Sequence, residues 1–452
     1  MRKISWFDLK NGMRVYIQPD RSSHVGGIGV KFGALHDPTA AFIGRAHTLE
    51  HMVARETKNF SKREIDIRLR ETSCGPWGSV DIWTNPTTTF YGCGILLRRK
   101  YLLSLFPVFA DMVVNPLFRN EGFSSEKAAI FTEYLLRGED SPEDTADRIL
   151  LENVYKTNPI ARRIDCDPEH LQKAGIYKIR EAWRKWYVPN NMFAVLLGPN
   201  RHEAKKIAEQ YFAHLEAKPV PALEYDHSED YPTLKDRLIC EVPYPSKTCH
   251  VLMGFPTEPW GNAYDSTLDV LAEILEFKIE EALRDQNTSW GHGTYHPSVW
   301  HDRTYVHGMF YIWFPTPSVE FAKKGEEIIL HEIRRIINNG VNESVVADTL
   351  REIPCNKQSA TQRKLKSRMR TEFREEVERL RRPVHDMYLA AFRDEPNTLS
   401  ELIADCASNG DPDLNGLNNF REFMGRVTKT RVVNAANRYL SAHHITVLLT
   451  PA

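Results

Sequence analysis

Short apolar runs alternate along the chain with longer segments in which apolar residues recur every three or four positions. The short runs are rich in β-branched residues and leucine and have the length of strands: 14–18, 27–32, 193–197, 238–242 and 445–449. The longer segments have the period of helices: a stretch from residue 43 onward, 96–114, 124–137, 266–284 and 319–339. A charged stretch at 358–382 predicts a helix with a solvated face. The pattern predicts sheets packed with helices.

Two segments near the middle and the end of the chain resemble each other. Residues 186–200 (WYVPNNMFAVLLGPN) and 438–452 (RYLSAHHITVLLTPA) align without a gap and share five identical residues. Each segment joins the end of a predicted helix to a predicted buried strand. A chance likeness between two helix–strand units is the alternative, but the alignment favours an internal duplication.

A proline-rich, acidic segment separates the two predicted copies. Residues 216–234 (EAKPVPALEYDHSEDYPTL) contain three prolines and have the composition of an inter-domain linker. The length of 452 residues alone suggests about three domains. The repeat and the linker instead predict two domains of similar size, at 1–215 and 235–452.

Composition excludes several classes of protein. Lys and Arg number 59 against 60 Asp and Glu, so no global positive charge attracts nucleic acid or anionic membrane. The longest apolar runs are far shorter than the roughly 20 residues of a membrane span, and the first residues, MRKISWFDLK, lack the apolar core of a signal peptide. Seven cysteines occur without C-x-x-C spacing. We expect a soluble protein of a reducing compartment, the cytoplasm.

The sequence His47-Thr48-Leu49-Glu50-His51 carries the clearest chemical signal. On a helix, positions i and i+4 lie one turn apart on the same face, so both imidazoles can reach a single ion. The glutamate between them has the place of a general base in the H-x-x-E-H form of zinc peptidases. A purely structural pair of histidines is the alternative. Catalytic zinc also requires a third protein ligand.

Two glutamates on a later predicted helix can provide that ligand. Glu126 and Glu133 are seven residues apart and therefore share one helical face. One of them can bind the metal while the other orients the ligands through hydrogen bonds. Spacing alone does not assign the two roles, and two solvated surface glutamates are the alternative.

Several motifs in this order resemble those of the pitrilysin/insulinase-type zinc metallopeptidases, also called inverzincins. The matching runs are FDLKNGMRVYIQPD, GRAHTLEHM, NPLF, the helical E-x6-E, and AEILEFKIEEALRDQ with the closing VLLTPA in the second half. The chain is similar to the short, two-domain members such as subunits of the mitochondrial processing peptidase. This resemblance implies an α+β fold of two homologous α/β-roll domains, in which mostly antiparallel sheets pack with helices. It also implies metal ligands in the first domain only.

The same resemblance implies roles for individual residues. His47, His51 and Glu133 become the ligands of Zn²⁺, Glu50 the general base and Glu126 a supporting carboxylate. The expected activity is that of an endopeptidase, in which Glu50 takes a proton from the attacking water and passes it to the leaving amine. The expected substrates are extended peptides or unfolded segments.

The family also binds the substrate backbone along an edge strand with the pattern N-A-x-T-x4-T-x-Y. The matching residues are Asp81, Ile82, Thr84, Thr89 and Tyr91. Asp81 stands where the family has asparagine. We hypothesise that its charge favours basic substrate residues; a plain polar residue at a strand end is the alternative.

The second domain departs from the family pattern. The family places an arginine and, seven residues later, a tyrosine against the substrate. Arg284 fits the arginine, but the nearest tyrosine, Tyr295, lies eleven residues later. Either an insertion shifts this tyrosine or a partner subunit supplies the contact.

The second half has no H-x-x-E-H motif of its own, so one active site per chain is expected. Four histidines there read as polar loop residues without a metal: His292, His296, His301 and His307. At about half the length of the long single-chain members, the protein is expected to form a homodimer or a heterodimer with a related subunit. A scaffolding or partner-dependent subunit of such a heterodimer is the alternative function.

Overall fold

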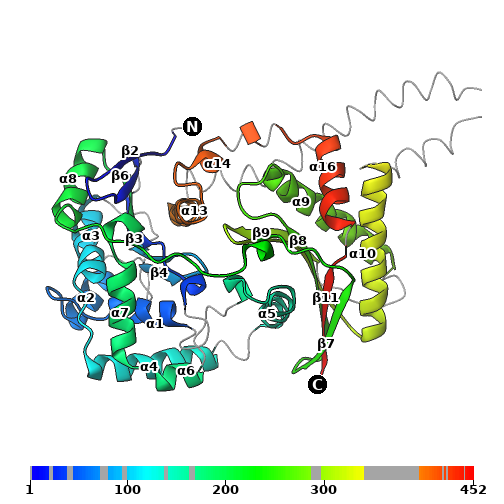
Figure 1. Ribbon diagram of the computed structural model, residues 1–452, viewed down its shortest axis with the longest axis horizontal. Coiled ribbons are helices and arrows are strands. Elements are labelled where there is room, and N and C mark those ends of the chain that lie inside the picture. The colour runs from blue at the N-terminus through cyan, green and yellow to red at the C-terminus, as the bar shows by residue number, and fades with distance from the viewer. Residues whose placement is uncertain are drawn as a thin grey trace, which may run out of the picture. The chain divides into compact units, whose positions relative to one another are not determined.

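The structure is a computed structural model of the chain (Figure 1). It describes residues 3–19, 24–37, 44–71, 80–93, 99–136, 141–161, 168–286, 297–340, 396–419, 422–423, 426–441 and 443–452. The chain divides into two compact units: unit 1 with Met1–Glu139, Thr157–Asp226 and Leu389–Asn419, and unit 2 with Asp140–Lys156, His227–Tyr388 and Phe420–Ala452. The division after Asp226 falls inside the segment 216–234. The domain limits given above stay a prediction.

Unit 1 is built on a six-stranded sheet. Its strands are β1 (Ser5–Asp8), β2 (Arg14–Pro19), β3 (Val25–Val30), β4 (Val80–Thr84), β5 (Thr89–Cys93) and β6 (Met192–Gly198). They lie in the order β1-β2-β6-β3-β5-β4, in which only β2 and β6 are parallel. Strand β4 therefore forms one edge of the sheet.

Unit 2 repeats this arrangement with five strands. They are β7 (Leu238–Tyr244), β8 (Cys249–Thr257), β9 (Ser298–Thr304), β10 (His307–Thr316) and β11 (Ile445–Pro451), in the order β7-β11-β8-β10-β9. Only β7 and β11 are parallel. Strands β6 and β11, in which the two similar segments end, hold the same place in the two sheets. The prediction of an α+β fold with two related halves is confirmed.

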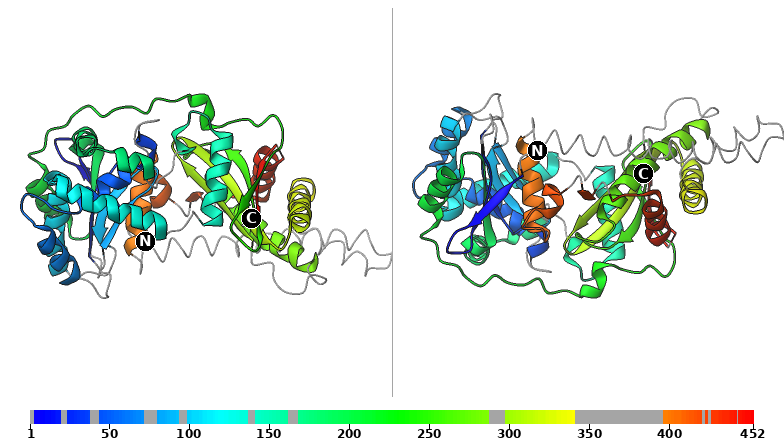
Figure 2. Two further views of the ribbon diagram at one scale, coloured as in Figure 1. Left: turned by 90° about the horizontal axis from the view of Figure 1, so that it is seen from below. Right: turned by 90° about the horizontal axis from the view of Figure 1, so that it is seen from above.

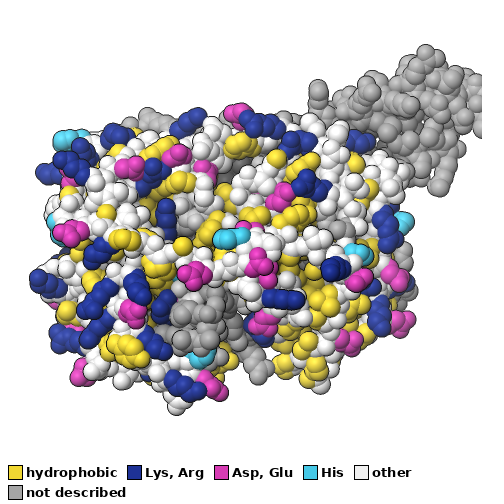
Figure 3. Space-filling view, in the orientation of Figure 1, with side chains coloured by type: hydrophobic (Ala, Val, Ile, Leu, Met, Phe, Trp, Pro, Cys, Tyr) yellow, Lys and Arg dark blue, Asp and Glu magenta, His cyan; other side chains and the backbone are white. Residues whose placement is uncertain are grey.

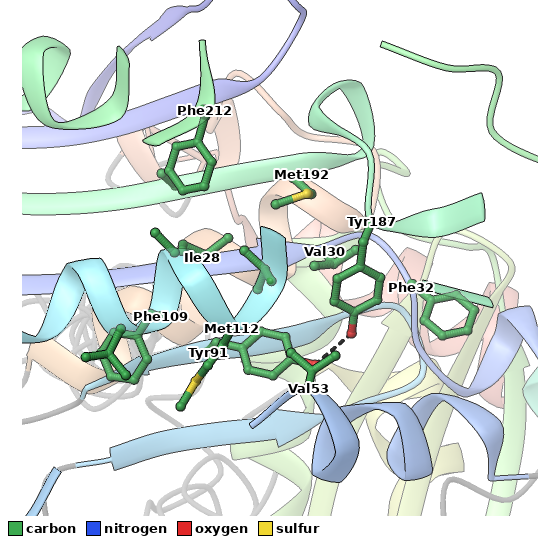
Figure 4. Close-up of a cluster of buried hydrophobic side chains, with 14 of the residues drawn as sticks. Ile28, Val30, Phe32, Val53, Tyr91, Phe109, Met112, Tyr187, Met192 and Phe212 are labelled. Atoms are coloured by element: carbon green, nitrogen blue, oxygen red, sulfur yellow. Dashed lines mark hydrogen bonds between the residues drawn. The ribbon is translucent and has the colours of Figure 1, made fainter. Parts of the chain in front are cut away.

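Helices of the first half cover one face of the sheet in unit 1. They are α1 (Arg45–Val53), α2 (Lys62–Glu71), α3 (Arg99–Val114), α4 (Asn120–Leu136), α6 (Pro168–Lys173), α7 (Ile176–Trp186) and α8 (Arg201–Phe212). Short 3-10 turns connect elements of the chain: η1 (Ala34–His36), η2 (Pro159–Ala161), η3 (Pro189–Asn191) and η4 (His227–Asp230). Alternate strand residues such as Ile28 and Val30 pack with Phe109 and Met112 of α3 in the core shown in Figure 4. Within it the hydroxyls of Tyr91 and Tyr187 hydrogen bond at 2.7 Å.

In unit 2, helices of the second half cover one sheet face. They are α9 (Asp265–Gln286), α10 (Val319–Asn339) and α16 (Lys429–Ala435), which continues into a π-helical turn at Ala436–Leu440. Leucines and isoleucines of α9 and α10 pack there against Val251, Met253 and Phe255 of β8. The limits of α10 are those that the apolar pattern predicts.

Each unit also contains one helical segment from the other half of the sequence. Helix α5 (Pro142–Val154) lies in unit 2, where Leu150 contacts the backbone of β8 at Gly254. Helices α13 (Pro396–Ser408) and α14 (Asn415–Asn418) lie in unit 1, against the sheet face opposite to α3 and α8 (Figure 2). Tyr16 belongs to this second face, because its neighbours Val15 and Ile17 point into the core of the first. The sequence pattern did not predict this exchange.

One predicted helix boundary is wrong. Helix α4 begins at Asn120, four residues before the Ser124 start that the capping pattern predicts. Phe123 is buried and its amide donates to the carbonyl of Arg119, while Gly122 packs closely under the side chain of Arg55. Packing of the first turn thus extends the helix. The predicted helix at 358–382 lies outside the described residues.

The described part of the chain contains no helix with the length and apolarity of a bilayer span. On the face drawn in Figure 3, Lys and Arg side chains are interspersed with Asp and Glu. The cytoplasmic location stays a prediction.

Candidate metal centre

Helix α1, which carries the H-x-x-E-H sequence, is anchored at its first turn. Gly44 precedes the helix with a φ of +81°, a conformation that favours glycine. The carboxyl of Asp37 accepts the backbone N–H groups of Gly44, Arg45 and Ala46 at 2.8, 2.9 and 3.1 Å. Burial raises the pKa of Asp37 to about 7, while the charge of Arg45 and these hydrogen bonds oppose the rise. The anchor fixes where the following turns of α1 lie.

The next turns of α1 bury two ionisable side chains. His47 and Glu50 are 7% and 8% exposed, among apolar neighbours such as Leu49, Met52 and Val53. Burying a polar group costs free energy unless the group gains partners. Their partners come from α4 and from β4.

Three side chains converge on one point. The Nε2 atoms of His47 and His51 lie 3.2 Å apart, and Oε2 of Glu133 on α4 lies 3.7 and 3.3 Å from them, respectively. Zinc bonds of about 2.0–2.2 Å in a tetrahedron place ligand atoms about 3.3–3.6 Å apart. The donor types and their spacing therefore fit a zinc ion. No other group of His, Cys, Asp and Glu within the described ranges has a comparable spacing.

Glu126 occupies a different place beside the same histidine. Its Oε2 lies 3.4 Å from Nδ1 of His51, and its Oε1 accepts a hydrogen bond from Arg55. A carboxylate on the far nitrogen of a histidine fixes the ring and its tautomer for metal binding. Of the two glutamates that spacing left open, Glu133 faces both Nε2 atoms. Arg55 was not predicted, although its position four residues after His51, just beyond the end of α1, was a usable signal.

The charges around His51 shift its pKa. Burial lowers this pKa, but the hydrogen bonds to Glu126 and Glu133 outweigh burial and raise it to about 9. Burial raises the pKa of Glu126, yet His51 and Arg55 hold it below its usual value. In the metal-free protein these contacts favour the positively charged imidazolium form of His51.

Glu50 is held from the other side by the edge strand. Oγ1 of Thr84 donates to Oε2 of Glu50 at 2.7 Å and lies 3.2 Å from Oγ1 of Thr89. Thr89 in turn donates to the carbonyl of Phe32 at 2.7 Å. This series of hydrogen bonds fixes one carboxylate oxygen of Glu50, which lies on the helix turn between the two histidines.

The predicted substrate strand is β4. Asp81 pairs with Gly92, Ile82 with Tyr91 and Thr84 with Thr89. Ile82 packs against the core, and Thr84 contacts Glu50. Tyr91 is buried and bonded to Tyr187, so its side chain belongs to the core.

The structure places the other predicted residues in unit 2. Arg284 lies in α9, whereas Tyr295, His292 and His296 lie outside the described residues. The expectation that His301 and His307 are loop residues is wrong, since they lie in β9 and β10. Both side chains are buried, His301 beside the hydroxyl of Thr257 at 2.9 Å and His307 beside that of Thr304 at 2.9 Å. Loop glycines nearby concealed the strand pattern.

Two family profiles match consecutive parts of the chain. Residues 14–168 match "Insulinase (Peptidase family M16)", and residues 176–353 match "Peptidase M16 inactive domain". The chain carries both domains of peptidase family M16. The first M16 profile contains the convergent residues of α1 and α4.

Curated relatives of this M16 protein include peptidases and their subunits. The uncharacterized zinc protease YmxG of Bacillus subtilis is 24% identical over 306 residues, which cover 65% of this chain and 70% of that protein. The probable mitochondrial-processing peptidase subunit beta of Schizosaccharomyces pombe is 25% identical over 215 residues, 46% of this chain and 44% of that one. This chain thus matches less than half the length of the processing-peptidase subunit.

Solved structures show the same fold. A protease from Helicobacter pylori superposes with a TM-score of 0.80 at 16% identity, over 100% of both chains. A peptidase M16 inactive domain from Pseudomonas fluorescens gives a TM-score of 0.77 at 16% identity, over 99% of this chain and 98% of that one. The two-domain M16 architecture therefore extends over the chain.

Proposed function

We propose that the protein is a zinc-dependent endopeptidase. The observation that carries this proposal is the convergence of His47, His51 and Glu133 at zinc-ligand spacing, with Glu50 on the same helix turn. The family and the relatives named as zinc proteases support it. A fold that needed only stability would gain nothing from burying these polar groups in α1.

His47, His51 and Glu133 would hold the metal, with His51 oriented by Glu126. When bound, zinc supplies a Lewis acid for the scissile carbonyl and lowers the pKa of a water molecule at the site. Glu50 removes a proton from that water as it attacks and then delivers the proton to the leaving amine. Thr84 keeps Glu50 oriented through its hydrogen bond to Oε2. One buried carboxylate thus moves the proton in both directions.

The substrate class follows from β4. An edge strand offers unpaired backbone groups, and an extended peptide can add to it through main-chain hydrogen bonds that are largely independent of sequence. We infer that extended peptides or unfolded segments bind there, beside Thr84 and Ile82. Asp81 on the same strand is proposed to favour basic residues in the substrate, which an Asp81→Asn variant tests through its cleavage preference.

The second candidate function is that of a subunit that needs a partner. Several relatives are named as alpha or beta subunits of the mitochondrial-processing peptidase, which favours this possibility. Arg284 and Tyr295 are eleven residues apart where the family has seven, so a related chain in a homodimer or heterodimer would complete the substrate contacts. Size-exclusion chromatography with activity assays on the fractions tests it; full activity in a monomer contradicts it.

Peptide cleavage tests the proposed function. Wild type and Glu50→Gln are loaded with zinc and assayed on an unfolded polypeptide and on short peptides, with and without a chelator. General-base catalysis contributes about 10²–10⁴-fold, so the variant should lose about that factor in kcat while it keeps its zinc. Cleavage that survives both the substitution and the chelator would refute the proposal.

A further inference from the structure

The turn between β4 and β5 is rigid. Oδ1 of Asn85 accepts the backbone N–H groups of Thr87 and Thr88 at 2.8 and 2.7 Å, and the backbone N–H of Asn85 donates to the carbonyl of Thr88 at 2.9 Å. An asparagine that bonds its own turn in this way holds the local backbone in one conformation. The position of the turn as a whole then depends on what it packs against.

On one side, the turn packs against the backbone that follows β3. The amides of Ala34 and Leu35 donate to the carbonyls of Asn85 and Pro86 at 3.1 and 2.9 Å. The approach is so close that a Cβ on Gly33 would lie 2.2 Å from the carbonyl oxygen of Asn85. Glycine at this position allows the contact.

On its other side, the turn is held by α13, which comes from the second half of the chain. Nδ2 of Asn85 donates to Oδ1 of Asp405 at 3.2 Å, and the hydroxyls of Thr88 and Ser408 hydrogen bond to each other. Thr88 is fully buried and Ser408 is 9% exposed. Breaking a buried hydrogen bond leaves its donor and acceptor unsatisfied, which costs free energy. The geometry of the Thr88–Ser408 pair is therefore held firmly.

The turn leads directly to the proposed general base. Thr84 immediately precedes Asn85 and Thr89 immediately follows Thr88. Thr84 donates to Glu50, and its hydroxyl also contacts that of Thr89. We propose that Asp405 and Ser408 are positioning residues for catalysis, which hold the β4–β5 turn so that Thr84 orients Glu50. This inference rests on the proposed function. It gives the second half of the chain a part in the chemistry through the exchanged helix.

The same segment provides a matched control. The hydroxyl of Tyr16 on β2 donates to the carbonyl of Pro412 at 2.8 Å, just after α13. Tyr16→Phe therefore removes one hydrogen bond between this segment and the sheet without touching the β4–β5 turn. A purely structural role of the segment predicts equal effects for this variant and for those at the turn.

Steady-state kinetics on the zinc-loaded full chain test the inference. Ser408→Ala and Thr88→Val each remove one of the two hydroxyls that form this hydrogen bond, whereas Thr88→Ser keeps both. Because small misplacements of reacting groups are costly, we expect the first two variants to lower kcat by about three- to tenfold. KM and zinc content should stay at wild-type values, and Tyr16→Phe and Thr88→Ser should keep wild-type kcat.

A double-mutant cycle gives the sharper readout. If Ser408 acts through Thr84, combining Ser408→Ala with Thr84→Val lowers kcat no further than Thr84→Val alone. The inference would be overturned if the two losses of kcat multiplied in the double variant, or if Tyr16→Phe lost as much kcat as the variants at the turn. Wild-type kcat in both Ser408→Ala and Thr88→Val would also overturn it. These outcomes differ from a failure of the proposed function, in which Glu50→Gln itself retains cleavage.

Discussion

The first α-helix after β3 in unit 1 differs sharply from the first α-helix after the equivalent strand, β8, in unit 2. In unit 1 this helix is α1, whose buried residues include His47 and Glu50; in unit 2 it is α9, whose buried residues include Leu268, Leu271 and Leu275. Apart from the additional strand β1 in unit 1, the sheets beneath them have the same strand order. One fold thus buries two histidine-motif residues in this helix of one copy and mainly apolar residues at the matching place of the other.

Unit 2 also has buried polar groups, and several of them pair with one another. Arg303 makes two hydrogen bonds to Asp269, at 2.7 and 3.0 Å, and His301 bonds Thr257 and lies beside Arg303. In unit 1 the ligand atoms instead converge on a point between them. Convergence on one point, more than burial, separates a site from a structural network.

The largest effect on stability is expected from a substitution in the apolar core of unit 2. Leu271 of α9 is fully buried, so Leu271→Ala should destabilise the protein by about 2–5 kcal/mol through lost burial and a cavity. Denaturant unfolding measures this loss. The folded fraction should keep wild-type cleavage per molecule, and a loss of kcat without a loss of stability would show that α9 serves the chemistry.

The next largest effect concerns the pH dependence of unit 2. Burial and the charge of Arg303 lower the pKa of His301 to about 4, although Asp269 and Asp302 act in the opposite direction. The unfolded chain therefore binds a proton near pH 6.5 and the folded protein only near pH 4, so stability is complete above pH 6.5 and falls as the pH drops. At about 1.4 kcal/mol per pKa unit the loss amounts to about 3 kcal/mol. Between pH 7 and pH 4 the free energy of unfolding should change less in His301→Gln than in wild type. The same pH dependence in both proteins would contradict the lowered pKa of His301.

A smaller effect is expected for the carboxylate that orients His51. Removal of such a partner costs about 10- to 100-fold in metal affinity, so Glu126→Gln should weaken zinc binding by that factor. Glu121→Gln, an exposed position on the same helix, is the control and should bind as wild type. Competition with a chelating dye measures both. Equal affinities for the two variants would mean that Glu126 does not support the ligand.

The smallest effect is the proton that zinc displaces. Because the pKa of His51 is raised to about 9 in the metal-free protein, zinc binding at pH 7 to 8 should release about one proton. Apparent zinc affinity should then fall about tenfold for each unit by which the pH drops below about 9. Calorimetry in two buffers of different ionisation enthalpy counts the protons, and a count near zero would contradict the raised pKa.

Much of this arrangement could be predicted because its signals are local. Strand and helix periods in the sequence located β2, β6 and α10, and the spacing of His47, Glu50 and His51 placed them on one helix face. The repeat of 186–200 in 438–452 predicted that both halves would share one topology.

Other features depend on contacts between distant residues, which no local pattern reveals. Spacing could not decide between Glu126 and Glu133, because only the packing of α4 on α1 places one at each nitrogen of His51. The exchange of α5 and α13 and the contacts of Ser408 were invisible for the same reason: Thr88 and Ser408 are 320 residues apart.

Metal content of the full chain tests most directly the claim that the first unit alone holds a metal centre. After dialysis against zinc and then against metal-free buffer, mass spectrometry should find one zinc per chain in wild type and in His301→Gln, and none in His51→Ala. Zinc that persists in His51→Ala, or that disappears in His301→Gln, would contradict the account.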